Sequence, residues 1–225
     1  YHHLSFSPDD SLLLAGNASH IWLLDMAQQL TRQELAILSS DNAIFTTKGA
    51  LFSATWLNND FLYFKIALSG QIKGYLYNRH SQHLVEVDNR WQVLLTDHKA
   101  PDTLFMIDAI DAQLYQMPMA HLVVDGKQQS IKFPEQMLSA TGTTIEKPYT
   151  EIKLYDGKIY YMTSANSGNT KPYDYQIEVK PIHAAANANI NVYKTSCSCG
   201  YDIADSGFMV SEQIGIEGDI HRTLH

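Results

Sequence analysis

The sequence predicts an all-β fold in which short strands form a series of four-stranded sheets. Apolar segments of strand length recur along the chain, and each is bounded by Gly, Asn, Asp, Ser or Pro. Thirteen tyrosines and eight phenylalanines supply side chains that favour strands. We expect residues 1–225 to form a single domain. Because the chain begins at Tyr1 and not at Met, we expect it to be a fragment of a longer protein.

The apolar segments have the lengths of strands and not of helices. In chain order they are residues 11–15, 21–24, 61–68, 74–77, 91–95, 103–107, 113–117, 158–163, 175–179, 189–194 and 207–211. Two segments are exceptions. Residues 26–38 consist mainly of good helix formers and predict a helix, and residues 134–140 predict a helical turn.

The segments fall into repeated units in which a polar turn precedes a buried strand. In the first unit, the turn Ser7-Pro8-Asp9-Asp10 precedes the strand at 12–15, and the strand at 21–24 ends at Asp25. The second strands of successive units begin near Leu12, Phe61, Thr103, Lys158 and Gly207. This uneven spacing lies near the roughly 40–50 residues of a four-stranded propeller blade.

The physical logic of such units favours a stack of sheets. A lone four-stranded meander cannot bury both of its faces, so each unit must pack against its neighbours. Acids such as Asp9, Asp10 and Asp156 can accept hydrogen bonds from nearby backbone amides and fix the strand reversals. The alternative is a β-sandwich, or an α+β domain with the helix at 26–38 on one face of a sheet.

The first unit resembles the repeats of WD-repeat and TolB-like β-propeller families. The resemblance rests on Ser7-Pro8-Asp9-Asp10 before an apolar strand and on Ile21-Trp22-Leu23-Leu24-Asp25 after it. The family turn is commonly Ser-Pro-Asp-Gly, so Asp10 departs from the pattern, as does Trp22, which lies three residues before Asp25 instead of adjoining it. The resemblance implies a β-propeller-like stack of blades. It also extends to the sensory portion of membrane-anchored transcription regulators with a winged helix.

Composition excludes two classes of partner for this segment. The chain has 16 basic and 24 acidic residues, a net charge of −8 and no basic run. Proteins that grip a phosphate backbone concentrate Lys and Arg, so we expect no direct contact with nucleic acid. Binding to an anionic membrane surface fails for the same reason. No run approaches the roughly 20 apolar residues of a spanning helix, so any attachment to a membrane would need an anchor outside this chain.

Recognisable catalytic chemistry is absent from the sequence. No Gly-x-Ser-x-Gly elbow and no glycine-rich phosphate loop occurs. His80, His83 and Asp88 supply too few ligands for a metal, and we interpret them as a solvated turn. Asp108 and Asp111 flank a turn, and we interpret them as turn caps. We therefore expect no catalytic residues, no cofactor, no metal site and no enzymatic activity.

Other candidate site residues are aromatic or lie in loops. Trp22, Trp56 and Trp91 are interpreted as core residues and not as ligand stackers. Asn17-Ala18-Ser19 is a glycosylation sequon that matters only in a secreted eukaryotic protein. The polar loop 164–170 could form an anion nest, but a loop between blade strands is the favoured interpretation.

These observations predict a non-catalytic module that binds a protein or a small ligand. We expect binding through inter-strand loops, with residues 78–82, 164–170 and 184–189 as the exposed surfaces. The resemblance implies a sensory role in a periplasmic or other extracytoplasmic location. The alternative is the non-catalytic propeller part of a hydrolase of the prolyl oligopeptidase kind.

The two cysteines give a first test. Cys197 and Cys199 have one residue between them, so a disulfide joining them would be strained and would close too small a ring to restrict the unfolded chain much. Replacing both with Ser should change the free energy of unfolding by less than about 1 kcal/mol. Denaturant melts under oxidising and reducing conditions measure this change, and a loss of several kcal/mol would contradict the prediction.

Overall fold

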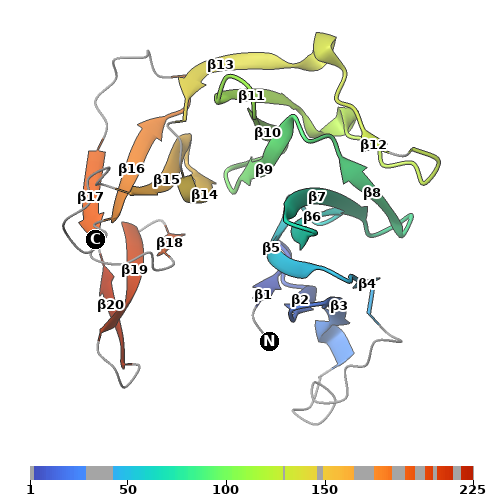
Figure 1. Cartoon of the computed structure of the whole chain (residues 1–225), viewed down its shortest axis with the longest axis horizontal. Coiled ribbons are helices and arrows are strands. Elements are labelled where there is room, and N and C mark those ends of the chain that lie inside the picture. Colours follow the sequence, from blue (N-terminus) through green and yellow to red (C-terminus); the bar gives the residue numbers. More distant parts are fainter. Residues whose placement is uncertain are drawn as a thin grey trace. The chain divides into compact units, whose positions relative to one another are not determined.

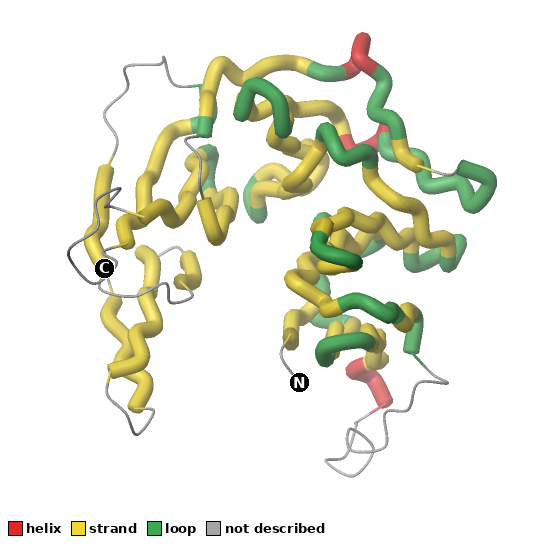
Figure 2. The backbone as a smooth tube through the Cα atoms, viewed as in Figure 1, coloured by secondary structure: helices red, strands yellow, loops and turns green. Residues whose placement is uncertain are grey.

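The computed structural model describes residues 3–28, 43–128, 130–145, 149–164, 175–183, 191–195, 201–204, 207–214 and 219–224. Within these residues the strands form five sheets (Figure 1). Figure 2 shows that strands predominate and that the helical segments are short. The latter are the single 3₁₀ turns η1 (Met26–Gln28), η3 (Met119–His121) and η4 (Glu135–Met137).

The sheets follow one another along the chain. The first contains β1 (His3–Phe6), β2 (Leu12–Gly16), β3 (His20–Asp25) and β4 (Phe45–Thr46). The second contains β5 (Ala50–Trp56), β6 (Phe61–Leu68), β7 (Gln71–Asn78) and β8 (His83–Val87), to which β12 (Ser130–Ile131) adds in parallel. The third contains β9 (Trp91–Asp97), β10 (Ala100–Asp108), β11 (Gln113–Pro118) and β13 (Ser139–Thr144).

The remaining two sheets lie in the last third of the chain. The fourth contains β14 (Tyr149–Tyr155), β15 (Lys158–Ser164), β16 (Tyr175–Pro181) and β17 (Asn191–Thr195), paired in chain order and antiparallel. The fifth contains β18 (Tyr201–Ala204), β19 (Gly207–Ile214) and β20 (Asp219–Leu224). This succession of meanders is the β-propeller-like fold that the sequence predicted, and the sandwich and α+β alternatives are wrong.

The predicted strands and the repeat are confirmed. The second strands of the five sheets are β2, β6, β10, β15 and β19, which begin at or near the residues that the repeat predicted. The apolar segments predicted as strands did not include β1, β4, β5, β8, β12, β14, β18 or β20, nor the largely polar β13, whose Gly142 has a φ of +81°. The helical turn predicted at 134–140 is η4. Of the helix predicted at 26–38, the first three residues form η1, and residues 29–38 lie outside the described part of the chain.

Backbone contacts group the chain into two compact units. The first consists of Tyr1–Thr96, Pro101–Ile110 and Gln116–Ser139, and the second of Asp97–Ala100, Asp111–Tyr115 and Ala140–His225. The expectation of a single domain over residues 1–225 stays a prediction. Each unit has buried apolar residues of its own.

The core of the first unit lies between the first and second sheets. Leu14 and Ile21 of the first sheet pack with a group from the second: Leu51, Trp56, Leu62, Phe64, Ile66 and Tyr77. The apolar run of β6 is buried on both faces, as expected for an inner strand covered from both sides. Trp56 also joins the two sheets, because its Nε1–H donates to the Ser5 carbonyl over 3.2 Å.

The core of the second unit is formed by residues of the fourth and fifth sheets. Met162 and Ile177 pack with Tyr201, whose hydroxyl donates to the Tyr160 carbonyl over 3.0 Å. Burial raises the pKa of Tyr201 well above its ordinary value. The fourth sheet also buries the carboxylate of Glu178, which accepts hydrogen bonds from the Tyr161 hydroxyl (2.6 Å) and the Gln176 amide (2.7 Å).

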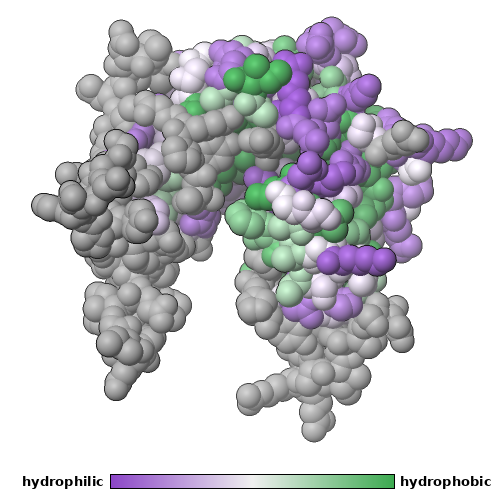
Figure 3. Space-filling view, in the orientation of Figure 1, coloured by the Kyte–Doolittle hydropathy of each residue, from purple (hydrophilic) through white to green (hydrophobic). Residues whose placement is uncertain are grey.

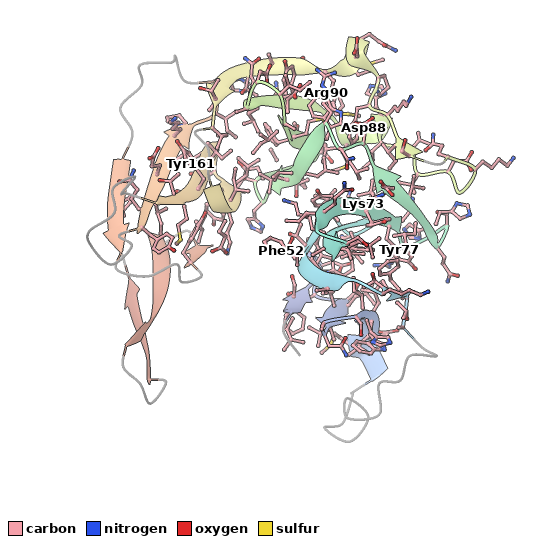
Figure 4. All side chains as sticks on the ribbon, viewed as in Figure 1. Phe52, Lys73, Tyr77, Asp88, Arg90 and Tyr161 are labelled. Atoms are coloured by element: carbon pink, nitrogen blue, oxygen red, sulfur yellow. The ribbon has the colours of Figure 1, made fainter. Side chains whose placement is uncertain are left out.

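Two phenylalanines on neighbouring strands test this account of the core. Phe64 on β6 is 0% exposed, whereas Phe52 on β5, labelled in Figure 4, is 55% exposed. Phe64→Ala should lower the free energy of unfolding by about 3–5 kcal/mol, because it leaves a cavity between two sheets. Phe52→Ala is the matched control and should cost less than about 1 kcal/mol. Chemical denaturation measures both, and equal losses would contradict the assignment of the core.

Candidate binding surface

The turn between β1 and β2 is closed by side chains. The Asp9 carboxylate accepts hydrogen bonds from the Ser7 hydroxyl (2.6 Å), the Ser11 hydroxyl (2.8 Å) and the Ser11 backbone N–H (3.1 Å). These bonds lower the pKa of Asp9 from 3.8 to about 2, and the bond from Ser7 makes the largest contribution to this shift. Asp10 has a φ of 57°, a left-handed conformation that Gly adopts most easily and that Asp tolerates. Asp10 thus adopts a backbone conformation that favours Gly, the residue expected here from the Ser-Pro-Asp-Gly pattern.

Asparagines close the corresponding turns of the second sheet. The Asn58 side-chain oxygen accepts hydrogen bonds from the backbone N–H groups of Asp60 (2.8 Å) and Phe61 (2.9 Å). At the next reversal at this end of the sheet, Asn78 accepts from the N–H groups of His80 (2.9 Å) and Ser81 (3.0 Å). Asn fits both places because its short side chain reaches amides two and three residues ahead.

These three turns are hydrogen-bonded to one another. The Asp9 N–H donates to the Asn59 side-chain oxygen (3.2 Å), which joins the first sheet to the second. The Arg79 N–H donates to the Asp60 carbonyl (2.9 Å), and the His80 Nε2 lies 2.8 Å from the Asp60 carboxylate. We call residues 7–11, 57–61 and 78–82 the turn surface. It is polar, and its shape is fixed by bonds between turns.

One backbone contact recurs at the same place in three sheets. In the first sheet the Met26 N–H donates to the Ser11 carbonyl over 3.0 Å, and in the fourth the Ile182 N–H donates to the Gly157 carbonyl over 2.8 Å. Both correspond to the bond between Arg79 and Asp60. The residue types differ at every position, so the repeat is preserved in the backbone and not in the side chains.

In the second unit the buried carboxylate of Asp97 joins two turns, as the Asn59 side chain does in the first unit. Asp97 is 2% exposed and accepts hydrogen bonds from the N–H groups of Lys99 (3.0 Å), Asp156 (3.0 Å) and Gly157 (2.6 Å). It therefore joins the β9–β10 turn to the β14–β15 turn. Sequence reasoning missed Asp97. Only its position at the end of an apolar strand signalled a turn cap, and nothing nearby in the sequence pointed to residues 156 and 157.

The structure separates the three residues of the partial metal motif. His80 lies against Asp60, whereas the His83 Nδ1 accepts a hydrogen bond from the Gly126 N–H over 3.0 Å. Asp88 caps its own turn by accepting from the Arg90 N–H over 2.9 Å. In the described part of the chain no three His, Cys, Asp or Glu side chains are grouped as a metal site requires.

Asp108 and Asp111 are turn caps, as predicted. Asp108 accepts hydrogen bonds from the Ile110 N–H (2.8 Å) and from Nε of Arg90 (2.7 Å), a residue that Figure 4 labels. Asp111 accepts from the Gln113 N–H (2.9 Å). Each carboxylate thus accepts a hydrogen bond from a backbone N–H of its own turn, as a turn cap does.

The remaining predictions have mixed outcomes. The three tryptophans are core residues, as predicted: Trp22, Trp56 and Trp91.

In loop 78–82, His80 to Gln82 are exposed, whereas Asn78 and Arg79 are half-buried and hold the turn. Cys197, Cys199, residues 165–170 and residues 184–189 lie outside the described part of the chain. Asn17 of the sequon accepts hydrogen bonds from the Ser19 and His20 amides.

The described surface is not dominated by one kind of side chain. Figure 3 shows hydrophilic and hydrophobic residues intermixed on the face in view. Leu4 and Phe6 on β1 and Phe52 on β5 are each more than half exposed. No helix among the described residues is long and apolar enough to cross a membrane.

Comparisons with known proteins establish the fold. No protein-family model and no curated protein sequence matches this chain. Among solved structures, tricorn protease is similar with a TM-score of 0.60 and 10% identity over 98% of this chain and 25% of its own. TolB from Acinetobacter baumannii is similar with a TM-score of 0.61 and 12% identity over 98% of this chain and 51% of its own. A chain of a nidogen–laminin complex gives a TM-score of 0.52 and 12% identity over 90% of this chain and 70% of its own.

These similarities support the TolB-like β-propeller fold that the sequence predicted. At 10–12% identity they concern the fold alone. This chain spans a quarter of the tricorn protease chain and about half of the TolB chain.

The acidity of Asp9 gives a test of the turn surface. A carboxyl whose pKa is lowered in the folded state stabilises the turn above its unfolded pKa. This contribution should be lost as the pH falls from 3.8 through about 2. An NMR titration of the Asp9 carboxyl should give a midpoint near 2. Ser7→Ala should raise this midpoint, because it removes the hydrogen bond that lowers the Asp9 pKa most. Ser5→Ala, outside this network, is the control, and an Asp9 midpoint near 3.8 in the wild-type protein would contradict the arrangement.

Proposed function

We propose that this chain is a non-catalytic binding module that recognises a protein partner through the turn surface. The carrying observation is the bonding of three turns to one another through Asn59, Asp60 and Arg79. A surface held in this way loses little conformational entropy when a partner docks, so more of the contact free energy appears as affinity.

The chemistry of the turn surface suits a polar, hydrogen-bonding partner. Asp9, Asp10 and Asp60 present carboxylates, and Arg79 and His80 add donors. The exposed apolar side chains Leu4 and Phe52 lie on β1 and β5, the strands that enter two of these turns. Protein interfaces combine apolar contacts with a polar rim of this kind. The similar chain from a nidogen–laminin complex is a protein of this fold that occurs in a protein–protein complex.

A sensory role in an extracytoplasmic compartment is the finer part of the proposal. It rests on the resemblance of the first repeat to TolB-like propellers and on the structural similarity to TolB. In that setting any contact with DNA or membrane would belong to other parts of a longer protein.

A second candidate is the non-catalytic part of a larger hydrolase. The structural similarity to a quarter of the tricorn protease chain favours it. The two candidates differ in the expected partner: the sensory module binds a separate protein, whereas the hydrolase part would act beside a catalytic domain.

The exposed pair Asp60 and His80 tests the binding role. Asp60→Asn combined with His80→Ala removes the pair without touching the backbone bonds of the turns, and exposed pairs contribute less than about 1 kcal/mol. We expect an almost unchanged melting temperature and at least about tenfold weaker capture of the partner, equivalent to about 1.4 kcal/mol. Gln71→Ala, an exposed substitution at the opposite end of the same sheet, is the control.

The measurement is quantitative mass spectrometry of proteins retained by the immobilised chain from an extract of the source cells. A protein retained equally by wild type and by the double variant would contradict recognition through the turn surface. A hydrolase panel is run on the same preparations. Robust turnover abolished by one point substitution would contradict the non-catalytic assignment.

A further inference from the structure

The first sheet ends at β1, which is its edge strand in the strand order β1-β2-β3-β4 (Figure 1). In the register of β1 with β2, Leu4 lies opposite Ala15 and Phe6 opposite Leu13. On its other side β1 has no partner strand among the described residues. An edge strand presents unpaired backbone N–H and C=O groups, and the register of β1 decides which residues present them.

The backbone groups of Leu4 and Phe6 point to the open edge. The Ser7 N–H donates to the Leu12 carbonyl over 2.9 Å, so these two residues form a hydrogen-bonded pair. Hydrogen-bonded pairs alternate along an antiparallel ladder. Ser5 therefore turns its N–H and C=O towards β2, whereas Leu4 and Phe6 turn theirs away. In the described part of the chain, these outward groups have one contact, from the Ser5 hydroxyl to the Phe6 carbonyl over 3.4 Å.

The side chains of the same two residues are apolar and exposed. Leu4 is 63% exposed and Phe6 is 54% exposed. Directly opposite residues share a face of the sheet, so two apolar rows run from β1 across β2 to β3. The rows are Leu4, Ala15 and Trp22, and Phe6, Leu13 and Leu24. Trp22 and Leu24 are buried, so each row is covered at β3 and open at β1.

Two other edge strands lack this regular arrangement. β5 and β14 also end their sheets, but the register shifts between Leu51 and Ser53 on β5 and between Tyr149 and Ile152 on β14. Such irregularities interrupt the alternation of backbone groups and protect an edge from pairing with another strand. β1 pairs with β2 without a shift over its whole length. It is therefore better suited than β5 or β14 to accept a further strand.

We propose that β1 binds an extended segment of a partner protein, which adds to the first sheet as a further strand and carries apolar side chains at alternate positions. A strand offers donors and acceptors at the spacing of the outward groups of Leu4 and Phe6, whereas a helix satisfies its own backbone groups. The alternate apolar side chains extend the two rows. The protein already contains an added strand, since β12 pairs with β8 although β9, β10 and β11 lie between them in sequence.

The inference rests on the proposed function in one respect, that the partner is a protein, and it adds the form of the segment that binds. β1 leads into residues 7–11 of the turn surface, so a segment bound to β1 lies beside that surface. The two sites consist of different residues, and substitutions can remove each of them separately.

The probe is a short synthetic peptide in which Val alternates with Thr, and its binding to the whole chain is measured by fluorescence anisotropy. It should bind more tightly than a peptide of the same composition with all Val residues in one block, because only alternation places every Val beside Leu4 and Phe6. Leu4→Ser with Phe6→Ser should weaken binding about tenfold, as expected for the loss of two cross-strand pairs. Ile72→Ser is the matched control, since Ile72 is exposed but lies on β7, which is paired on both sides.

A second experiment uses wild-type protein and therefore does not depend on the folding of the serine variants. N-methylation of the peptide at one alternate set of residues should abolish binding, and N-methylation of the other set should not, because only every second amide of an added strand faces β1. Amide hydrogen exchange at Leu4 and Phe6 should slow when the unmethylated peptide binds. Exchange at Ser5, whose N–H already belongs to the ladder, should be slow before the peptide is added.

Several results would overturn the proposal. They are equal binding of the alternating and block peptides, equal effects of the two N-methylated sets, and unchanged exchange at Leu4 and Phe6. Slower exchange at high protein concentration without peptide would assign the edge to pairing between two copies of this chain instead. Asp60→Asn with His80→Ala should leave peptide binding unchanged, and a loss in this variant would place the peptide at the turn surface. Failure at β1 with retained capture of a partner by the turn surface leaves the proposed function standing, so the two failures are distinguishable.

Discussion

The hydrogen bond from a backbone N–H to an Asp or Asn two residues earlier is the interaction on which the rest of the fold depends. A chain of short antiparallel strands reverses often, and each reversal leaves amides without a ladder partner. In the described residues the acceptors of such bonds are Asp9, Asn17, Asp25, Asn58, Asn78, Asp88, Asp97, Asp108, Asp111 and Asp125. The acidic balance of the chain is therefore partly a consequence of its turns, and it is a poor guide to the charge of a partner.

Turns that are closed internally can also be joined to one another. The Asn59 side chain accepts a hydrogen bond from the Asp9 backbone N–H. The buried Asp97 carboxylate accepts hydrogen bonds from the backbone N–H groups of two residues in another hairpin. In both places a polar group at one reversal satisfies a backbone amide at the next sheet. The same bonds that hold neighbouring sheets in register thus shape the polar surface to which we assign binding.

Glu178 and Lys65 are charged residues within strands, but only Glu178 is buried. Glu178 keeps its carboxylate in the fourth sheet because Tyr161 and Gln176 donate to it. Lys65 lies within the apolar strand β6, but its side chain is only partly buried. Buried charged groups in proteins are normally paired, as Glu178 is, whereas a partly exposed charge such as that of Lys65 can remain in contact with water.

The sequence by itself determined where many of the strands lie, which residues close many of the turns, and that the units repeat. These features depend on interactions over a few residues: alternation along a strand, and an Asp or Asn two residues before an amide. It likewise placed Trp22, Trp56 and Trp91 in the core, because large aromatic side chains are seldom left in water. The short polar strand β13 could not be predicted from the sequence, because its pairing with β11 and not its composition makes it a strand.

Only the tertiary structure decided which turns meet. The bond between Asp9 and Asn59 spans 50 residues, and that between Asp97 and Gly157 spans 60. The addition of β12 to β8 and the alignment of Ser53, Lys65 and Gly74 across β5, β6 and β7 likewise depend on strand register. Such contacts arise when the packing of apolar faces brings distant hairpins together, and no local pattern of residues encodes that choice of partner.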